Sequence, residues 1–268
     1  MLGVSRSAYY AWRERDPSGR DQRQARLTPL VRALFWKHQR RYGARRIAAD
    51  LADLGEGGSP RVVGIIMKNQ GLRAIQPKAF VPRTTASRHH LGYSPNLMVD
   101  TPEPDGMNQL WVGDITYLPL RGGAFAYLAL LMDRYSRDIV GWELDDTMTD
   151  ALTLAALRMA IGERQPPASL IHHSDRGGQY ASARYRDVLR RAAMRQSMSR
   201  AGNVYDNAFM ESCFGTFKTE LEMTEYEDCR AARAEIAEYI AYYRTERKHS
   251  SLGYLSPAHF ESLTTLRT

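Results

Sequence analysis

The sequence has very little cysteine and no long apolar run. Cys213 and Cys229 are the only cysteines in 268 residues and form no Cys-x-x-Cys pair, which argues against a disulfide framework and a cysteine-based zinc site. The longest apolar run, residues 124–132, is far shorter than the roughly 18 residues that a membrane-spanning helix needs. The first residues also lack the apolar stretch of a signal peptide. We therefore expect a cytosolic protein with no membrane association.

Acidic residues are scarce in the first third of the chain. Residues 1–90 hold 18 Lys/Arg against 6 Asp/Glu, a net charge of +12, whereas the remainder holds 19 against 24, a net charge of −5. Such a basic stretch is either a solvated surface or a module that binds a polyanion. Its concentration in one segment of an otherwise acidic chain favours the polyanion-binding module.

Residues 1–75 show short helical patterns. Apolar residues recur at helical spacing over 27–39 and 45–54, and Ser59-Pro60 begins a third helix that ends at Gly71. The last two helices, joined by a Gly-rich turn, resemble a helix-turn-helix, whose second helix enters the major groove of DNA. Helical hairpins also occur in proteins that never touch DNA, but the basic surroundings favour DNA binding. The candidate DNA contacts are basic residues of these two helices: Arg45, Arg46, Arg61 and Lys68.

Residues 76–108 lose this periodicity and contain five prolines, which predicts a linker, with Arg83 and Arg88 available to phosphates. A domain of residues 109–222 follows. Its strand patterns cover 111–118, 124–132, 139–144, 169–173 and 196–199, and its helix patterns cover 149–161 (ended by Gly162) and about 182–194. Three meander strands followed by helix–strand alternation predict an α/β domain with a mixed five-stranded sheet. Residues 223–268 are expected to be a helical extension of it.

Three acids stand out in this domain. Asp114 lies in the first strand, Asp175 follows the fourth, and Glu211 lies on an amphipathic helix after the fifth. On that helix Glu211 and Lys218 fall at the edge of the apolar face, overlooking the seam with the sheet. Glu220 falls inside the apolar face, and the sequence does not explain it.

Three carboxylates from different elements suit a divalent-metal site for phosphodiester chemistry, because magnesium prefers hard oxygen ligands and completes its shell with water and substrate phosphate. We expect the three side chains to converge. Asp133 and Asp138 are interpreted as turn residues, without chemistry. His172 and His173, beside Asp175, either shuttle protons or pack at the end of the strand; packing is the commoner role.

Several short motifs run over nearly the whole chain. They are Gly3-Val-Ser-Arg-Ser-Ala-Tyr-Tyr-Ala-Trp12, Arg41-Tyr-Gly-Ala-Arg-Arg-Ile47, Trp111-Val-Gly-Asp-Ile-Thr-Tyr117, His173-Ser-Asp-Arg-Gly-Gly-Gln-Tyr180, Met198-Ser-Arg200, Asn203 with Tyr205-Asp-Asn-Ala208, Glu211 through Lys218, and His249-Ser-Ser-Leu-Gly-Tyr-Leu-Ser-Pro257. In its three acids the chain resembles the DDE polynucleotidyl transferases of the retroviral-integrase type. In the whole set of motifs it is more closely similar to the second-reading-frame protein of insertion sequence 3 family transposases.

The resemblance implies an RNase H-like fold and a transposase that cleaves transposon ends and joins a 3′-hydroxyl to target DNA. It makes Asp114, Asp175 and Glu211 the catalytic ligands of two Mg²⁺ or Mn²⁺ ions, and Lys218 a contact to the transposon end. It also implies double-stranded DNA as partner and a homo-oligomer on DNA. Family members usually work as a fusion with an upstream-frame protein that carries another helix-turn-helix and a coiled coil. The family often has Asn where this chain has Arg244.

Two alternatives remain open. One is an RNase H-type nuclease that cuts without joining; the late-helix Glu211 and the basic N-terminal segment favour a transposase. The other is a DNA-binding regulator whose α/β domain is a scaffold, against which the intact acid triad argues.

Overall fold

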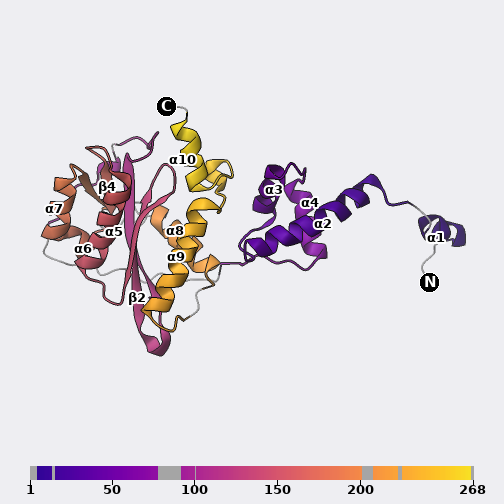
Figure 1. The fold of residues 1–268 in the computed structure, drawn as a ribbon, viewed down its shortest axis with the longest axis horizontal. Helices are drawn as coiled ribbons and strands as arrows, with labels where there is room; N and C mark the ends of the chain where they lie inside the picture. Colours follow the sequence, from indigo (N-terminus) through magenta and orange to yellow (C-terminus); the bar gives the residue numbers. More distant parts are fainter. Residues whose placement is uncertain are drawn as a thin grey trace. The chain divides into compact units, whose positions relative to one another are not determined.

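The chain folds into two units, of which the first is helical. The structure, a computed structural model, describes residues 5–13, 16–77, 92–99, 101–200, 208–222 and 225–266, and the chain divides into units 1–76 and 77–268. The sequence-based assignments at Arg83, Arg88, Asn203 and 205–207 lie outside the described residues. The helices of the first unit are α1 (Arg6–Arg13), α2 (Gly19–Lys37), α3 (Ala44–Asp53) and α4 (Pro60–Asn69), labelled in Figure 1.

Helix α2 begins eight residues before the predicted start at residue 27. Its N-terminus is a capping box: the Ser18 hydroxyl accepts from the Asp21 amide at 3.3 Å, and the Asp21 carboxylate accepts from the Ser18 amide at 3.1 Å. The first two turns are polar and mostly exposed, so they carry no apolar periodicity from which a helix could be predicted.

Helices α2, α3 and α4 enclose a small core, and α3 and α4 form the predicted helix-turn-helix. Each helix contributes buried apolar residues: Leu27, Val31, Phe35, Ile47, Leu51, Val63 and Ile66. The turn after α3 contains Gly55 at φ 74°, a left-handed conformation that favours glycine. Ser59 then caps α4 by accepting from the Val62 amide, as predicted. A buried contact of 2.7 Å between His38 and Asp50 ties α2 to α3.

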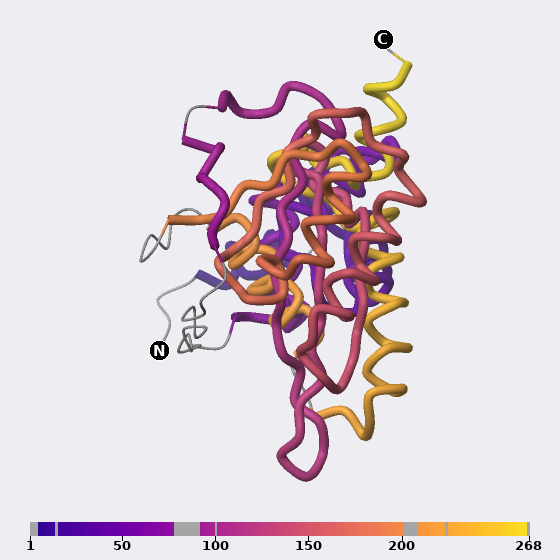
Figure 2. The backbone as a smooth tube through the Cα atoms, turned by 90° about the vertical axis from the view of Figure 1, so that its left-hand side faces the viewer, coloured from indigo at the N-terminus to yellow at the C-terminus, as the bar shows by residue number. Residues whose placement is uncertain are grey.

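The second unit is built on a five-stranded mixed sheet in the order β3-β2-β1-β4-β5. The strands are β1 (Leu110–Pro119), β2 (Phe125–Asp133), β3 (Ile139–Asp145), β4 (Ile171–Ser174) and β5 (Arg195–Met198). β1, β2 and β3 form an antiparallel meander, while β4 pairs with β1 and β5 in parallel. The prediction of a mixed five-stranded sheet is confirmed, with strand ends shifted by one or two residues. The long β1–β2 hairpin extends past the shorter strands (Figure 2).

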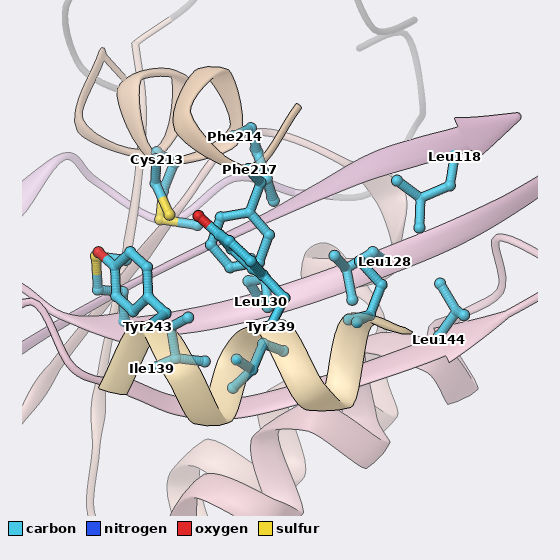
Figure 3. Close-up of a cluster of buried hydrophobic side chains, with 14 of the residues drawn as sticks. Leu118, Leu128, Leu130, Ile139, Leu144, Cys213, Phe214, Phe217, Tyr239 and Tyr243 are labelled. Atoms are coloured by element: carbon cyan, nitrogen blue, oxygen red, sulfur yellow. The ribbon is translucent and has the colours of Figure 1, made fainter. Parts of the chain in front are cut away.

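Helices cover both faces of this sheet (Figure 1). On one side lie α5 (Asp150–Arg164), α6 (Gly178–Ala181) and α7 (Ala183–Arg191), and on the other α8 (Ala208–Glu220) and α9 (Cys229–Thr245), with α10 (Pro257–Thr265) after α9. Each face has its own apolar cluster. Figure 3 shows part of the α8–α9 cluster, in which Phe214 and Phe217 of α8 and Tyr239 of α9 pack over Leu128 and Leu130 of β2.

The segment before β1 packs along β5. Leu97 donates its amide to Ser197 Oγ at 2.9 Å, and Ser94 Oγ donates to Gln196 Oε1 at 2.7 Å. Residues 97–99 form a short 3₁₀ helix there. Among all the helices that the structure describes, none is long and apolar enough to cross a membrane.

The end of α5 differs from the sequence-based expectation. Gly162 lies inside the helix, which ends instead at Gln165 in a left-handed conformation, φ 43°. Thr149 occupies the N-cap position but its hydroxyl makes no capping hydrogen bond. Gly162 therefore has no role that requires glycine, whereas Gly141 of β3 has a steric one, because α5 passes directly over it and leaves no room for a Cβ.

We predict opposite effects of alanine at these two glycines. A Cβ on Gly141 would lie 2.3 Å from the Ala156 carbonyl oxygen, so Gly141→Ala should lower the free energy of unfolding by about 1–3 kcal/mol. A Cβ on Gly162 meets no described atom within 4 Å, so Gly162→Ala should raise it by about 0.5–1 kcal/mol. Urea unfolding followed by circular dichroism measures both. A Gly141→Ala variant as stable as the wild type would contradict the close packing of α5 on β3.

Candidate active site

The parallel pairing of β1 with β4 brings Asp114 and Asp175 together. Residues 110–113 pair in register with 171–174, and the last pair is Gly113 with Ser174. Asp114 and Asp175 are the next residue on each chain segment. Neighbouring strands lie about 4.8 Å apart, so the backbone positions of the two acids are adjacent, just past the end of the paired stretch of β1 and β4.

Both carboxylates are half-buried and are oriented by the backbone beside them. Asp114 Oδ1 accepts from the Ile115 amide at 2.7 Å, and Asp175 Oδ1 accepts from the Gly177 amide at 2.9 Å. Both acids also lie near the buried Tyr180. Burial raises the pKa of the Tyr180 phenol well above its ordinary value, and the charges of Tyr185, Asp114 and Asp175 raise it further. One oxygen of each carboxylate is thus held by an amide of its own chain segment.

Helix α8 brings Glu211 and Lys218 to the same face of the sheet as Asp114. Val112 of β1 packs in the α8–α9 cluster, and side chains alternate along a strand, so Asp114 projects toward the face that α8 covers. Lys218 Nζ lies 4.7 Å from the ring centroid of Tyr117 on β1. Burial lowers the pKa of the Lys218 amine, and the charge of Asp114 opposes that shift. Lys218 is therefore within electrostatic reach of Asp114.

Glu211 occupies the exposed side of α8, next to the buried Met210. Within the described ranges, no three His, Cys, Asp or Glu side chains are grouped closely enough to hold a metal ion. The structure therefore brings two of the three predicted acids together and presents the third on the adjoining helix. In chemical type, carboxylate oxygens from three elements match the ligands that Mg²⁺ takes.

His172 and His173 are structural residues here. Both are buried; His172 Nε2 lies 3.0 Å from the Tyr185 hydroxyl, and His173 contacts Ser197 Oγ at 2.8 Å and Ser199 Oγ at 3.2 Å. Burial, with a smaller effect of the His173 charge, lowers the pKa of His172 to about 3. Of the two roles left open by the sequence, the packing role fits these contacts.

The two aspartates interpreted as turn residues are also buried anchors. Asp133 accepts from the amides of Asn108 at 2.6 Å, Tyr135 at 2.9 Å and Ser136 at 3.0 Å. Asp138 forms ion pairs with Arg244 at 3.0 Å and Arg164 at 3.2 Å. Arg244, where the family often has Asn, therefore holds α9 against the turn before β3. No sequence pattern signals this pairing, because Asp138 and Arg244 lie 106 residues apart.

The predicted DNA contacts of the N-terminal unit lie on α3 and α4. Arg45 is exposed on α3, and Arg61 and Lys68 are exposed on α4, seven residues apart and thus on one face. Arg46 is half-buried, with its guanidinium 5.5 Å from the ring centroid of Tyr42.

Comparison with known proteins identifies the class. Family models described as "Integrase core domain" match residues 104–204 and 192–257, and one described as "HTH-like domain" matches residues 21–80. A helix-turn-helix region before a mixed five-stranded sheet of the integrase-like RNase H fold defines an integrase-core protein of the DDE superfamily.

Relatives cover nearly the whole chain. The Insertion element IS600 uncharacterized 31 kDa protein of Shigella sonnei is 41% identical over 262 residues, which are 97% of this chain and 96% of that protein. The Transposase InsF for insertion sequence IS3A of Escherichia coli (strain K12) is 39% identical over 266 residues, 98% of this chain and 92% of the relative. The chain belongs to the insertion sequence 3 family of transposases, which confirms the resemblance seen in its motifs.

Two solved structures show lower similarity. The HTLV-2 integrase catalytic core domain in complex with magnesium (trimeric form) matches at a TM-score of 0.42 and 15% identity, over 57% of this chain and 96% of that chain. The simian T-cell lymphotropic virus intasome in complex with PP2A regulatory subunit B56 gamma matches at a TM-score of 0.48 and 14% identity, over 86% and 73%.

The buried His172 predicts a pH dependence of stability. Its pKa is about 3 in the folded protein and about 6.5 when unfolded, so between these values only the unfolded chain takes up the proton. The free energy of unfolding should then fall as pH drops below 6.5, by up to about 1.4 kcal/mol per pH unit from this residue. His172→Gln, which keeps an acceptor for Tyr185, should reduce that slope in urea titrations at pH 7, 6 and 5. An unchanged slope would contradict a neutral, buried His172.

Proposed function

We propose that this protein is the catalytic protein of a DNA transposase, which cleaves transposon ends and joins the resulting 3′-hydroxyl to target DNA with divalent metal. The observation that carries the proposal is the register of Asp114 beside Asp175 at the edge of β1 and β4, in a chain of a transposase family. Glu211 is the third acid of the site. A DNA-binding regulator has no need for these three acids, because it carries out no metal-dependent chemistry.

Asp114, Asp175 and Glu211 would hold two Mg²⁺ or Mn²⁺ ions. When bound, such a pair activates the attacking oxygen, water for cleavage or a 3′-hydroxyl for joining, and stabilises the leaving 3′-oxygen. The chain supplies orientation. The amides of Ile115 and Gly177 fix one oxygen of each aspartate, so those carboxylates do not reorient as DNA arrives. Clustered carboxylates repel one another without metal, which is consistent with Glu211 lying outside a closed cluster.

Lys218 is proposed to contact the phosphate backbone of the transposon end. Its ammonium lies against Tyr117 on β1 and within electrostatic reach of Asp114. A cation there offsets repulsion between the acids and the DNA phosphates, and it sets where the backbone enters the site. Lys218→Ala should therefore weaken binding of end DNA more than binding of metal.

The N-terminal unit is proposed to bind double-stranded DNA through α3 and α4, with Arg45, Arg46, Arg61 and Lys68 as contacts. We further propose that the protein acts as a homo-oligomer on DNA in the bacterial cytosol. An upstream-frame protein with its own helix-turn-helix and coiled coil, either separate from this chain or fused to it, would complete recognition of the transposon ends.

The amide variants Asp114→Asn, Asp175→Asn and Glu211→Gln test the catalytic assignment. Each keeps the shape of the side chain and removes a negative metal ligand. Because loss of a group that merely supports a ligand typically costs about 10–100-fold, loss of the ligand itself should lower both cleavage and strand transfer by about 100-fold or more. Both steps are measured on labelled end DNA with Mg²⁺ or Mn²⁺.

Glu238→Gln, at an exposed position of α9, is the matched control and should keep full activity. Wild-type strand transfer by any one of the three amide variants would rule out the assignment. Cleavage without any joining by the wild-type protein, with or without the upstream protein, would instead indicate a nuclease.

DNA binding by the N-terminal unit predicts a change in salt dependence. Arg61→Ala with Lys68→Ala should weaken duplex binding and reduce the slope of log K against log salt by about 1 for each phosphate that is no longer neutralised. Fluorescence anisotropy across salt concentrations measures this slope. Arg158→Ala, which removes an exposed charge from α5, is the control. Equal slopes for the double variant and the wild type would exclude α4 from the DNA interface.

A further inference from the structure

Helix α8 ends in a buried carboxylate. Glu220, its last residue, is 7% exposed and lies on the apolar face, where the hydrophobic pattern offers no reason for an acid. Arg247, which follows α9, is 4% exposed and reaches it with two parallel hydrogen bonds: Nη2 to Oε1 at 2.7 Å and Nε to Oε2 at 2.9 Å. The Tyr239 hydroxyl also donates to Glu220 Oε2 at 2.9 Å. The acid is thus fully paired in a bidentate arrangement.

Arg247 is itself held from the other side. Its Nη1 lies 3.2 Å from His249 Nε2, and its guanidinium lies 5.4 Å from the ring centroid of Tyr243. The His249 amide in turn donates to the Leu255 carbonyl oxygen at 2.9 Å. Residues 247–255, part of a motif that the catalytic proposal leaves without a role, therefore form a small folded segment attached to the end of α8.

Aromatic side chains already pack α8 against α9 beside the Glu220–Arg247 pair. Phe217 packs against Tyr239 with ring centroids 4.7 Å apart and against Tyr243 at 5.6 Å, and these rings lie together in Figure 3. Replacing a buried ion pair by apolar residues is often neutral or stabilising, so stability alone is a weak reason to bury Glu220. The two parallel hydrogen bonds between Arg247 and Glu220 are also directional. They fix how the last turn of α8 is rotated about the helix axis and how closely it approaches Arg247.

A helix transmits that constraint along its length. Lys218 lies two residues before Glu220, and Glu211 lies nine before it, about two and a half turns along the same helix. A rotation of α8 about its axis would change the positions of both side chains relative to Asp114. The Glu220–Arg247 pair is a polar anchor at the end of this helix that opposes such a rotation.

We propose that Arg247 is a positioning residue: through Glu220 it sets the orientation of α8 and thereby places Glu211 and Lys218 relative to Asp114. The inference rests on the proposed function of these residues. Arg247 does not touch the reacting atoms, and its role is to hold α8 in the orientation from which Glu211 joins the other two acids when metal and DNA bind.

Two variants test this role. Arg247→Lys keeps the charge but not the planar pair of donors, and Glu220→Leu with Arg247→Met replaces the pair by apolar side chains of similar size. Both should bind duplex DNA like the wild type. We expect an affinity for Mn²⁺ alone, measured by calorimetry, that is about tenfold weaker, and a strand-transfer rate about tenfold lower, as for other residues that support metal ligands.

Asp138→Asn is the control, because it weakens buried ion pairs with Arg244 and Arg164, and neither of these arginines belongs to α8. Even if Asp138→Asn lowers the melting temperature as much as Arg247→Lys does, it should keep wild-type Mn²⁺ affinity. Wild-type Mn²⁺ affinity and rate in Arg247→Lys would overturn the proposal, as would an equal weakening in Asp138→Asn. If the double variant does not fold, Arg247→Lys decides; if neither folds, the pair serves stability and positioning is rejected.

Asp114→Asn measured in parallel separates the two proposals. If Asp114→Asn retains strand transfer, the proposed function itself fails. If Asp114→Asn is inactive while Arg247→Lys behaves as wild type, only the positioning role fails.

Discussion

The parallel pairing of β1 with β4 is the constraint on which the candidate site depends. On both strands the paired stretch is followed by an acid, and the four-residue register makes those acids neighbours. β4 ends at Ser174, so the part of β1 that continues past Asp114 has no β4 beside it. Lys218 reaches Tyr117 on this continuation. A slip of one residue would send one carboxylate to the opposite face of the sheet.

The second layer of the site, α8, is held by residues far away in the sequence. Its apolar face packs on β1 and β2, while its last residue pairs with Arg247 beyond α9. The turn before β3 is tied to α9 by Asp138 and Arg244 in a similar way. The ion pairs of Arg244 and Arg247 therefore give these C-terminal residues a structural role in the second unit: they hold α9 and α8 in place.

Much of this architecture could be predicted from the sequence, because periodicity reports local structure. The continuous apolar run at 124–132 and the alternation around Asp114 located the central strands, and Ser59-Pro60 located α4. The polar start of α2 carries no such signal. Long-range polar pairs were also invisible: Glu220 looked misplaced because its partner lies 27 residues away. Sequence motifs identify Asp114, Asp175 and Glu211 as candidates. Their spacing does not show that Asp114 and Asp175 follow paired positions of β1 and β4, or that Glu211 is exposed on α8.

The three acids are proposed to form one metal site, and the catalytic assignment depends on that site. A crystal structure of the protein grown with Mn²⁺, in which anomalous scattering locates the metal, measures this directly. We expect metal between Asp114 and Asp175, with a Glu211 oxygen at ligand distance, close to the roughly 2.0–2.1 Å at which Mg²⁺ is bound. Metal bound elsewhere, or an ordered α8 with Glu211 turned away from bound metal, would contradict a shared site.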